Sequence, residues 1–107
     1  MTFSIKDLNP YTHPAGVELD HILHKRLLAQ DDTGGIPPYS IDASLSSKIR
    51  AKLKSKYGHP IIVGRTRMSN RPFFARYDSD PSTATEVVAE TEALAICRLA
   101  LVLLKRD

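Results

Sequence analysis

The sequence predicts an α+β fold in which three helices pack on a small, mainly antiparallel sheet. Apolar residues recur every three or four positions in three stretches, about 14–29, 41–57 and 92–105, as on one face of a helix. Between the last two stretches the apolar period changes to two, which is typical of a β-hairpin over about 61–78. Apolar residues make up 42% of the chain, an ordinary share for a soluble domain with one core.

The first two helices have recognisable signals at their ends. Pro14 suits a first helical turn, apolar positions follow it at helical spacing, and the Gly/Pro-rich segment 30–39 predicts a loop. Ser40 is expected to cap the second helix, with Asp42 in its first turn, where the helix dipole favours a carboxylate. Gly58 is expected to end this helix.

The register of the predicted hairpin decides which side chains share a face of the sheet. If Arg67 lies opposite Pro72, strand alternation gathers three arginines on one face beside an aromatic ring. A slip of one residue would scatter them. Under the expected register, the residues that share this face are Ile61, Val63, Arg65, Arg67, Phe74 and Arg76.

The last part of the chain predicts one more strand and one more helix. β-branched residues favour a third strand over about 83–89, with the start of a helix as the alternative. Thr91 can cap the final helix, 92–105, which is apolar around most of its circumference. We therefore expect this helix to be buried by several neighbours or to lie at a subunit interface.

Charge is distributed unevenly along the 107 residues, whose net charge is +3. Residues 43–77 contain nine Lys or Arg and no acidic residue, while 1–42 and 78–107 each contain three basic and six acidic residues. This pattern predicts either an anionic partner for the middle segment or internal pairing with the two ends.

The composition also bears on the compartment. A single cysteine excludes an intrachain disulfide, and the first residues, MTFSIKDLNPY, contain no apolar core of signal-peptide length. The C-terminal apolar run is interrupted by Arg98 and is far shorter than the roughly 20 residues that span a bilayer. We expect one cytoplasmic domain over 1–107, with 1–13 as an N-terminal extension.

Three motifs of this chain occur together in one known family. PAGVELDHILHKRLL lies at 14–28, IPPYSID at 36–42 and ETEALAICRLAL at 90–101. In this order, over about 14–103, they resemble the phage ABA-sandwich domain family, although the chain lacks the tryptophans common there. The resemblance implies a three-layer α/β/α sandwich, with helices on both faces of the sheet, in a phage or prophage protein of an infected or lysogenic bacterial cell. It implies no catalytic residues.

The residues capable of catalysis or metal binding do not form an enzyme signature. No Gly-rich phosphate loop, GxSxG or HExxH motif is present. His21 and His24 have a spacing compatible with metal binding, but we expect them on a helix surface and expect no metal or cofactor. His59 could act as an acid–base group, although it fits a helix stop better. Cys97 is expected to be buried and inert.

Arg98 lies in the most apolar helix, where a lone charge is costly to bury. The expected solution is an ion pair with Asp20 or Asp42, because these carboxylates belong to the other two matched motifs. Such pairing would hold the three helices together.

The leading functional hypothesis is a non-enzymatic phage accessory protein that binds a small anionic ligand, such as a nucleotide-type signal of bacterial defence. Guanidinium groups bind phosphate and carboxylate and stack on rings, so arginines mixed with aromatics suit such a ligand. We expect a homo-oligomer joined through the apolar helix 92–105. The alternatives are a protein–protein module that inhibits or redirects a host factor, a nucleic-acid binder that uses the lysine-rich helix, and a solvated arginine face without a ligand. The candidate ligand-binding residues are Arg65, Arg67, Arg71, Phe74 and Arg76.

Overall fold

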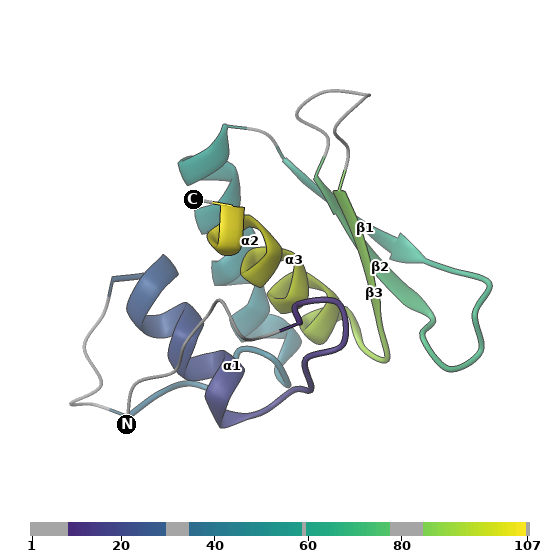
Figure 1. Ribbon diagram of the computed structural model, residues 1–107, viewed down its shortest axis with the longest axis horizontal. Coiled ribbons are helices and arrows are strands. Elements are labelled where there is room, and N and C mark those ends of the chain that lie inside the picture. Colours follow the sequence, from purple (N-terminus) through teal and green to yellow (C-terminus); the bar gives the residue numbers. More distant parts are fainter. Residues whose placement is uncertain (1–8, 30–34, 59, 78–84, 107) are drawn as a thin grey trace.

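The computed structural model describes residues 9–29, 35–58, 60–77 and 85–106, and of residue 106 only the backbone. Within this part of the chain, three α-helices and a three-stranded antiparallel sheet of order β1-β2-β3 confirm the α+β class and the third strand (Figure 1). The elements are α1 (Val17–Ile22), the π-helix η2 (Leu23–Leu27), α2 (Ala43–Tyr57), β1 (Ile61–Arg65), β2 (Phe73–Tyr77), β3 (Thr85–Ala89) and α3 (Glu92–Arg106).

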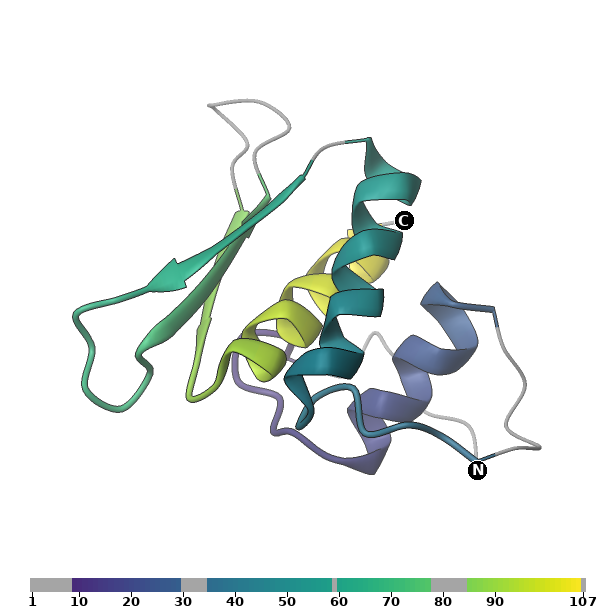
Figure 2. The ribbon, with the colours of Figure 1, turned by 180° about the vertical axis from the view of Figure 1, so that it is seen from behind.

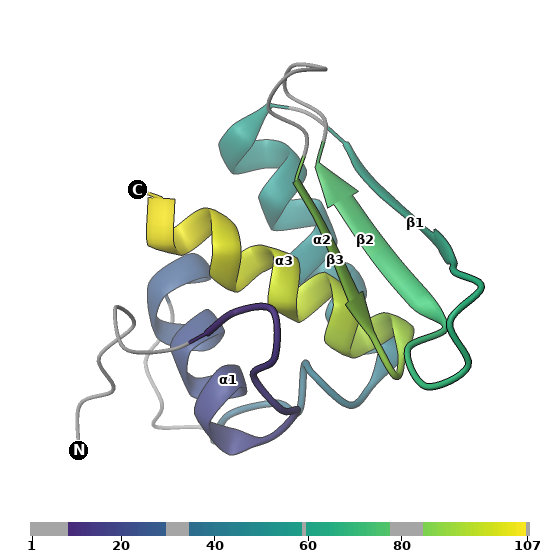
Figure 3. The same ribbon diagram turned by 45° about the vertical axis from the view of Figure 1, so that its right-hand side comes forward.

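Helix α3 lies at the centre of the fold, between the sheet and α1 (Figures 1 and 3). Every residue from Ala93 to Leu103 is buried, because β2 and β3 cover one side of this helix while α2 and η2 cover others. Burial by several neighbours is therefore the correct explanation of its apolar circumference. The homo-oligomer expected through this helix stays a prediction, although the chain itself covers the apolar side chains.

The sheet is covered by helices on one face only. Figures 1 and 2 show all three α-helices on the same side of the sheet, with α1 farthest from it. Ala75 and Val87 point toward the helices and are buried, whereas on the opposite face Ile62 is 46% exposed and Phe74 is half-buried. The α/β/α order of layers expected from the resemblance is therefore wrong for the described residues.

The first helix starts later than expected and changes its pitch. Gly16 has a φ of 149°, which is incompatible with a helix, so α1 begins at Val17 and Pro14 lies outside it. A backbone hydrogen bond from Leu28 to Leu23 (3.0 Å) closes the wider π-turn that follows. The four apolar positions that predicted the helix are all buried, namely Leu19, Ile22, Leu23 and Leu27.

Helix α2 begins after Asp42 and ends where the sequence predicts. The Asp42 carboxylate accepts hydrogen bonds from the backbone N–H groups of Ser44 (2.9 Å) and Leu45 (3.4 Å), so the N-cap expected at Ser40 is wrong by two residues. Gly58, in the left-handed conformation with a φ of 88°, terminates the helix as expected.

The register of the hairpin differs from the expected one by one residue. The backbone N–H of Thr66 donates to the carbonyl of Pro72 (2.7 Å), and the Thr66 hydroxyl donates to the carbonyl of Arg71 (2.6 Å). These two bonds close the loop between β1 and β2, and they place Arg65 opposite Phe73. The expected register is therefore wrong by one residue, because Thr66, and not Arg67, lies opposite Pro72.

Candidate functional site

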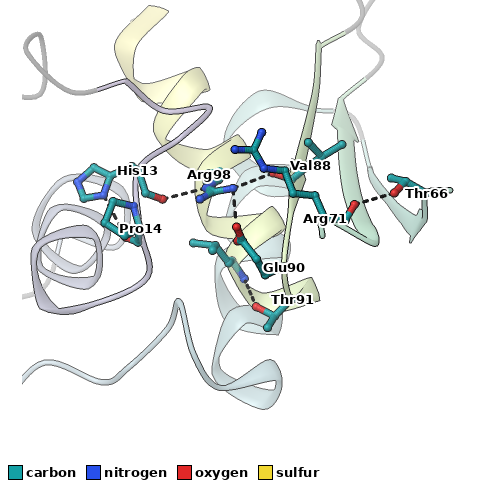
Figure 4. A network of polar contacts seen from close by, with 9 residues as sticks. His13, Pro14, Thr66, Arg71, Val88, Glu90, Thr91 and Arg98 are labelled. Carbon is teal, nitrogen blue, oxygen red and sulfur yellow. Dashed lines mark hydrogen bonds and ion pairs between the residues drawn. The ribbon is translucent and has the colours of Figure 1, made fainter. Parts of the chain in front are cut away.

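Arg98 connects the central helix to two distant segments of the chain. Only 3% of this residue is exposed. Its Nε donates to the carbonyl of His13 (2.8 Å) and its Nη1 to the carbonyl of Val88 (2.9 Å), as Figure 4 shows. Nη1 also lies 3.7 Å from a carboxylate oxygen of Glu90. Arg98 thus joins α3, β3 and the segment before α1.

The ion pairs expected between Arg98 and the two aspartates are wrong. Asp20 accepts a hydrogen bond from the backbone N–H of Ser40 (2.7 Å), and Asp42 caps α2. Nearby backbone N–H groups therefore satisfy both carboxylates. Asp20 still joins two elements, since its bond to Ser40 connects α1 to the loop that precedes α2.

Arg98 also lines a cavity of about 460 Å³. The walls come from the segment before α1, the loop before α2, the hairpin loop and the start of α3. Three charged residues, Arg71, Glu90 and Arg98, are among those that line it, and Figure 4 shows their side chains close together. The other lining residues are Thr12, Pro14, Ala15, Ser40, Ile41, Thr91 and Leu94.

Arg71 is the second cationic group of the cavity. Its backbone is held by the Thr66 hydroxyl, while its guanidinium makes no hydrogen bond or ion pair with any residue that the structure describes. Burial lowers the pKa of Arg98, the Glu90 carboxylate opposes this change, and the positive charge of Arg71 adds to it. Two like charges therefore lie near each other at one cavity, an arrangement that a bound anion would relieve.

Two hydroxyl groups at the cavity can donate hydrogen bonds. The Ser40 oxygen accepts from the N–H of Gly16 (2.9 Å), and the Thr91 oxygen accepts from the N–H of Leu94 (3.1 Å), which caps α3 as expected. Neither hydroxyl donates to a described residue, so its proton is available to a ligand. Apart from Glu90, the polar side chains around the cavity therefore favour a ligand with acceptor groups.

His13 fixes the segment that forms the outer wall of the cavity. Its ring Nε2 lies 2.7 Å from a carboxylate oxygen of Glu18, and its ring Nδ1 lies 3.1 Å from the carbonyl of Pro14. The imidazole is buried, and its backbone carbonyl is the group that Arg98 binds. These contacts hold Ala15 beside the cavity.

The change of register separates the predicted ligand-binding residues. Arg65 lies on the helix face, where its guanidinium carbon is 5.2 Å from the centre of the Phe73 ring. Phe74 and Arg76 lie on the opposite, open face of the sheet. Arg67 is exposed in the hairpin loop. The single arginine face expected from the sequence is therefore wrong.

Arg71 is the one predicted ligand-binding residue that lines the cavity. The sequence does not predict the rest of the wall, because it indicates Arg98 only as a charge in an apolar helix, and Ser40 and Thr91 only as helix caps. A signal was present in the sequence, because all three family-like motifs contribute to this wall through 14–15, Ser40 and 90–98. Motifs far apart in the chain thus meet at one cavity.

The remaining reactive groups do not form a second site. Burial raises the pKa of the Cys97 thiol far above its ordinary value, and the Asp20 carboxylate raises it further, so the thiol is inert. His24 is buried and hydrogen-bonded to the Tyr39 hydroxyl (2.8 Å), contrary to the surface position expected. His59 lies outside the described residues, among which no cluster of three or more His, Cys, Asp or Glu side chains could hold a metal ion.

Comparison with known proteins shows a shared fold. The chain is similar to a phage protein from Bacillus cereus ATCC 14579, known from a crystal structure at 2.0 Å, with a TM-score of 0.61 and 22% sequence identity, covering 95% of this chain and 94% of that chain. No family model matches the chain, and no curated protein matches its sequence. The fold therefore occurs in a phage protein, while membership of the phage ABA-sandwich domain family is not confirmed. None of the described helices is long and apolar enough to cross a bilayer.

Proposed function

We propose that this protein is a small phage or prophage accessory protein that binds a small anionic ligand in the cavity between Arg71 and Arg98, without catalysing a reaction. The observation that carries the proposal is a pair of guanidinium groups at one cavity, of which Arg71 has no partner among the described residues. The fold shared with a phage protein supports the setting. In an infected bacterium, a nucleotide-type defence signal is one ligand of this class.

The energetics of the cavity support binding of an anion. A charge-assisted hydrogen bond contributes about 1.5–3 kcal/mol, and an anion beside both arginines would also reduce their mutual repulsion. The wall on the side of His13 is already held by hydrogen bonds to Glu18 and Arg98. Little backbone ordering is therefore needed on binding, which lowers its entropic cost.

Thermal unfolding in the presence of linear and cyclic nucleotides, small carboxylates, and short DNA and RNA tests the proposal. A ligand at about 100 times its dissociation constant stabilises the protein by about 2.7 kcal/mol, which raises Tm by several degrees. Arg71→Gln should abolish this shift. The matched control, Arg67→Gln, changes an exposed arginine of the same loop and should keep the shift.

Two results of this experiment would contradict the proposal. If Arg71→Gln and Arg67→Gln reduced the ligand-induced Tm shift equally, the positive charge of the loop, and not the cavity, would account for binding. Stabilisation by any polymer, lost at high salt, would instead favour nucleic-acid binding through the lysines of α2 and the hairpin.

A protein–protein module is the second candidate function, and the open face of the sheet favours it. Ile62 on this face is 46% exposed, and Met68 in the adjoining loop is 45% exposed. Exposed apolar side chains next to arginine are typical of protein interfaces. The absence of any shift with small anions, together with loss of partner binding in Ile62→Ser, would favour this function.

A further inference from the structure

The cavity carries less positive charge than its two arginines alone would give. Glu90 lies 3.7 Å from Nη1 of Arg98, so Arg71, Arg98 and Glu90 together contribute one positive charge. Arg98 is also largely committed, since Nε and Nη1 already donate to backbone carbonyls at 2.8 and 2.9 Å. Arg71 therefore presents the one fully available guanidinium among the described residues of this wall.

One nitrogen of Arg98 keeps its hydrogen-bonding capacity. Its Nη2 makes no hydrogen bond with the described residues, and no fully buried side-chain nitrogen or oxygen among them lacks a partner. Nη2 is therefore not fully buried, and Arg98 is one of the residues that line the cavity. Beside Arg71 it provides one further donor, enough to complete the binding of a single carboxylate.

The rest of the wall is mostly apolar. Pro14 and Ala15 form one side, Leu94 of α3 lies in the wall, and Ile41 is 66% exposed in the loop before α2. A ligand with an apolar body would remove this exposed surface from water. None of the described lining residues is aromatic, so a nucleotide base would have no ring on which to stack.

We infer that the cavity takes a monoanion that consists of one carboxylate, bound by Arg71 and Nη2 of Arg98, on an apolar body packed against Ile41 and Leu94. The inference rests on the proposed function and narrows its ligand class. One carboxylate balances the single net positive charge, and its planar shape suits a guanidinium. A di- or triphosphate would place surplus negative charge close to Glu90.

Titration of the full chain with four probes, followed by calorimetry, tests this inference. Octanoate and octan-1-ol share an apolar body and differ in the carboxylate, whereas acetate has the carboxylate without the body. ATP has negative charge and a base but no apolar chain. Octanoate should bind about tenfold or more tightly than each of the other three.

Three substitutions at positions that are not fully buried locate the binding site. Arg71→Gln should weaken octanoate binding about tenfold and leave octan-1-ol unchanged. Ile41→Ser should weaken octanoate binding about threefold and leave acetate unchanged. Arg67→Gln is the control and should change neither. Far-UV circular dichroism of each variant checks that the fold is kept.

The outcomes separate this inference from the proposed function. ATP binding as tight as that of octanoate, and lost in Arg71→Gln, would overturn the monoanion inference and leave anion binding in place. Equal binding of octan-1-ol and octanoate, unaffected by Arg71→Gln, would overturn both. Failure of octanoate to bind would overturn the inference, and the nucleotide and carboxylate panel would then decide the proposed function alone.

Discussion

The edge strands of the sheet and the hairpin loop both lie beside arginines, yet these arginines behave differently. Arg50 of α2 donates from Nε and Nη2 to the carbonyl of Ile61 in β1 (3.1 and 2.8 Å), and Arg98 of α3 donates to the carbonyl of Val88 in β3. The guanidinium of Arg71 in the loop has no such partner among the described residues. A helix beside the sheet thus places guanidinium groups against backbone acceptors, whereas the loop leaves Arg71 for a ligand.

This difference also affects which partners the sheet can take. β1 and β3 are the two edges, and each has a carbonyl bonded to a charged side chain of a helix. Charged side chains placed against edge strands limit pairing with another chain. A partner that adds a strand is therefore disfavoured, and the cavity and the open face of the sheet remain as binding surfaces.

The largest expected effect is that of Arg98→Met. The substitution leaves the carbonyls of His13 and Val88 without their donor in a buried setting, which should lower the free energy of unfolding by about 2–4 kcal/mol. Arg67→Met, in the exposed part of the hairpin loop, should stay within about 0.5 kcal/mol of the wild type. Urea unfolding of both variants measures the difference. Equal losses of unfolding free energy in the two variants would mean that the arginines bonded to the sheet do not differ from those of the hairpin loop.

A smaller effect is expected where Phe74 covers Gly64 on the open face. A Cβ atom at position 64 would lie 2.7 Å from the Phe74 ring, so Gly64→Ala should destabilise the protein by about 1–2 kcal/mol. The same substitution in a Phe74→Ala background should cost close to nothing, because the ring is gone. A double-mutant cycle by chemical unfolding measures this coupling. No coupling would mean that the ring is free for a ligand, as the sequence had suggested.

Arg50→Ala should cost about 1 kcal/mol, less than the loss at Arg98, because the hydrogen bond to Ile61 forms at a more exposed position. Lys52→Ala is the matched control on the same helix, since it also removes one positive charge and changes the helix propensity by about the same amount. Its unfolding free energy should change by less than about 0.5 kcal/mol. A loss in Lys52→Ala as large as that in Arg50→Ala would show that helix charge, and not the edge contact, is responsible.

The features that the sequence predicts correctly are those with local causes. Gly58 and Thr91 mark helix ends through their own conformation and side chain, and the apolar circumference of α3 indicates burial on all sides. The observed hairpin register instead includes two hydrogen bonds of Thr66 in the loop, from its backbone N–H to the carbonyl of Pro72 and from its hydroxyl to the carbonyl of Arg71. The spacing of apolar residues carries no information on such bonds. The predicted register was therefore wrong by one residue, and the predicted arginine face was wrong with it.

The sequence predicts the cavity around Arg98 only in part, because the partners of this arginine are mainly backbone groups. The need of Arg98 for partners follows from its apolar neighbours, but its partners are mainly backbone carbonyls, which every residue supplies. No pattern of residue types can distinguish one carbonyl from another. The aspartates were the visible candidates, and both are bound to backbone N–H groups instead.

Asp42 provides the smallest and most specific test, because it was expected to pair with Arg98 and in fact caps α2. Hydrogen bonds from the side chain and the backbone N–H of Ser44, and from the N–H of Leu45, hold the pKa of the Asp42 carboxyl below its ordinary value of 3.8. The ionised cap therefore stabilises the fold above about pH 4, and this contribution is lost as the pH falls through the lowered pKa. Asp42→Asn keeps a capping oxygen without the charge, so its Tm should lie slightly below the wild type at pH 7, and the difference should shrink as the pH falls through the lowered pKa.

Ser44→Ala shows whether the cap geometry is the cause. It removes the hydrogen bond that lowers the Asp42 pKa most, that of the Ser44 hydroxyl at 2.6 Å, and should reduce the pH-dependent part of the difference. An ion pair with Arg98 would predict the opposite, since Ser44→Ala would leave the pH dependence unchanged while Arg98→Met abolished it. Tm values of the wild type, Asp42→Asn, Ser44→Ala and Arg98→Met between pH 2 and pH 7 thus distinguish the helix cap from the expected salt bridge.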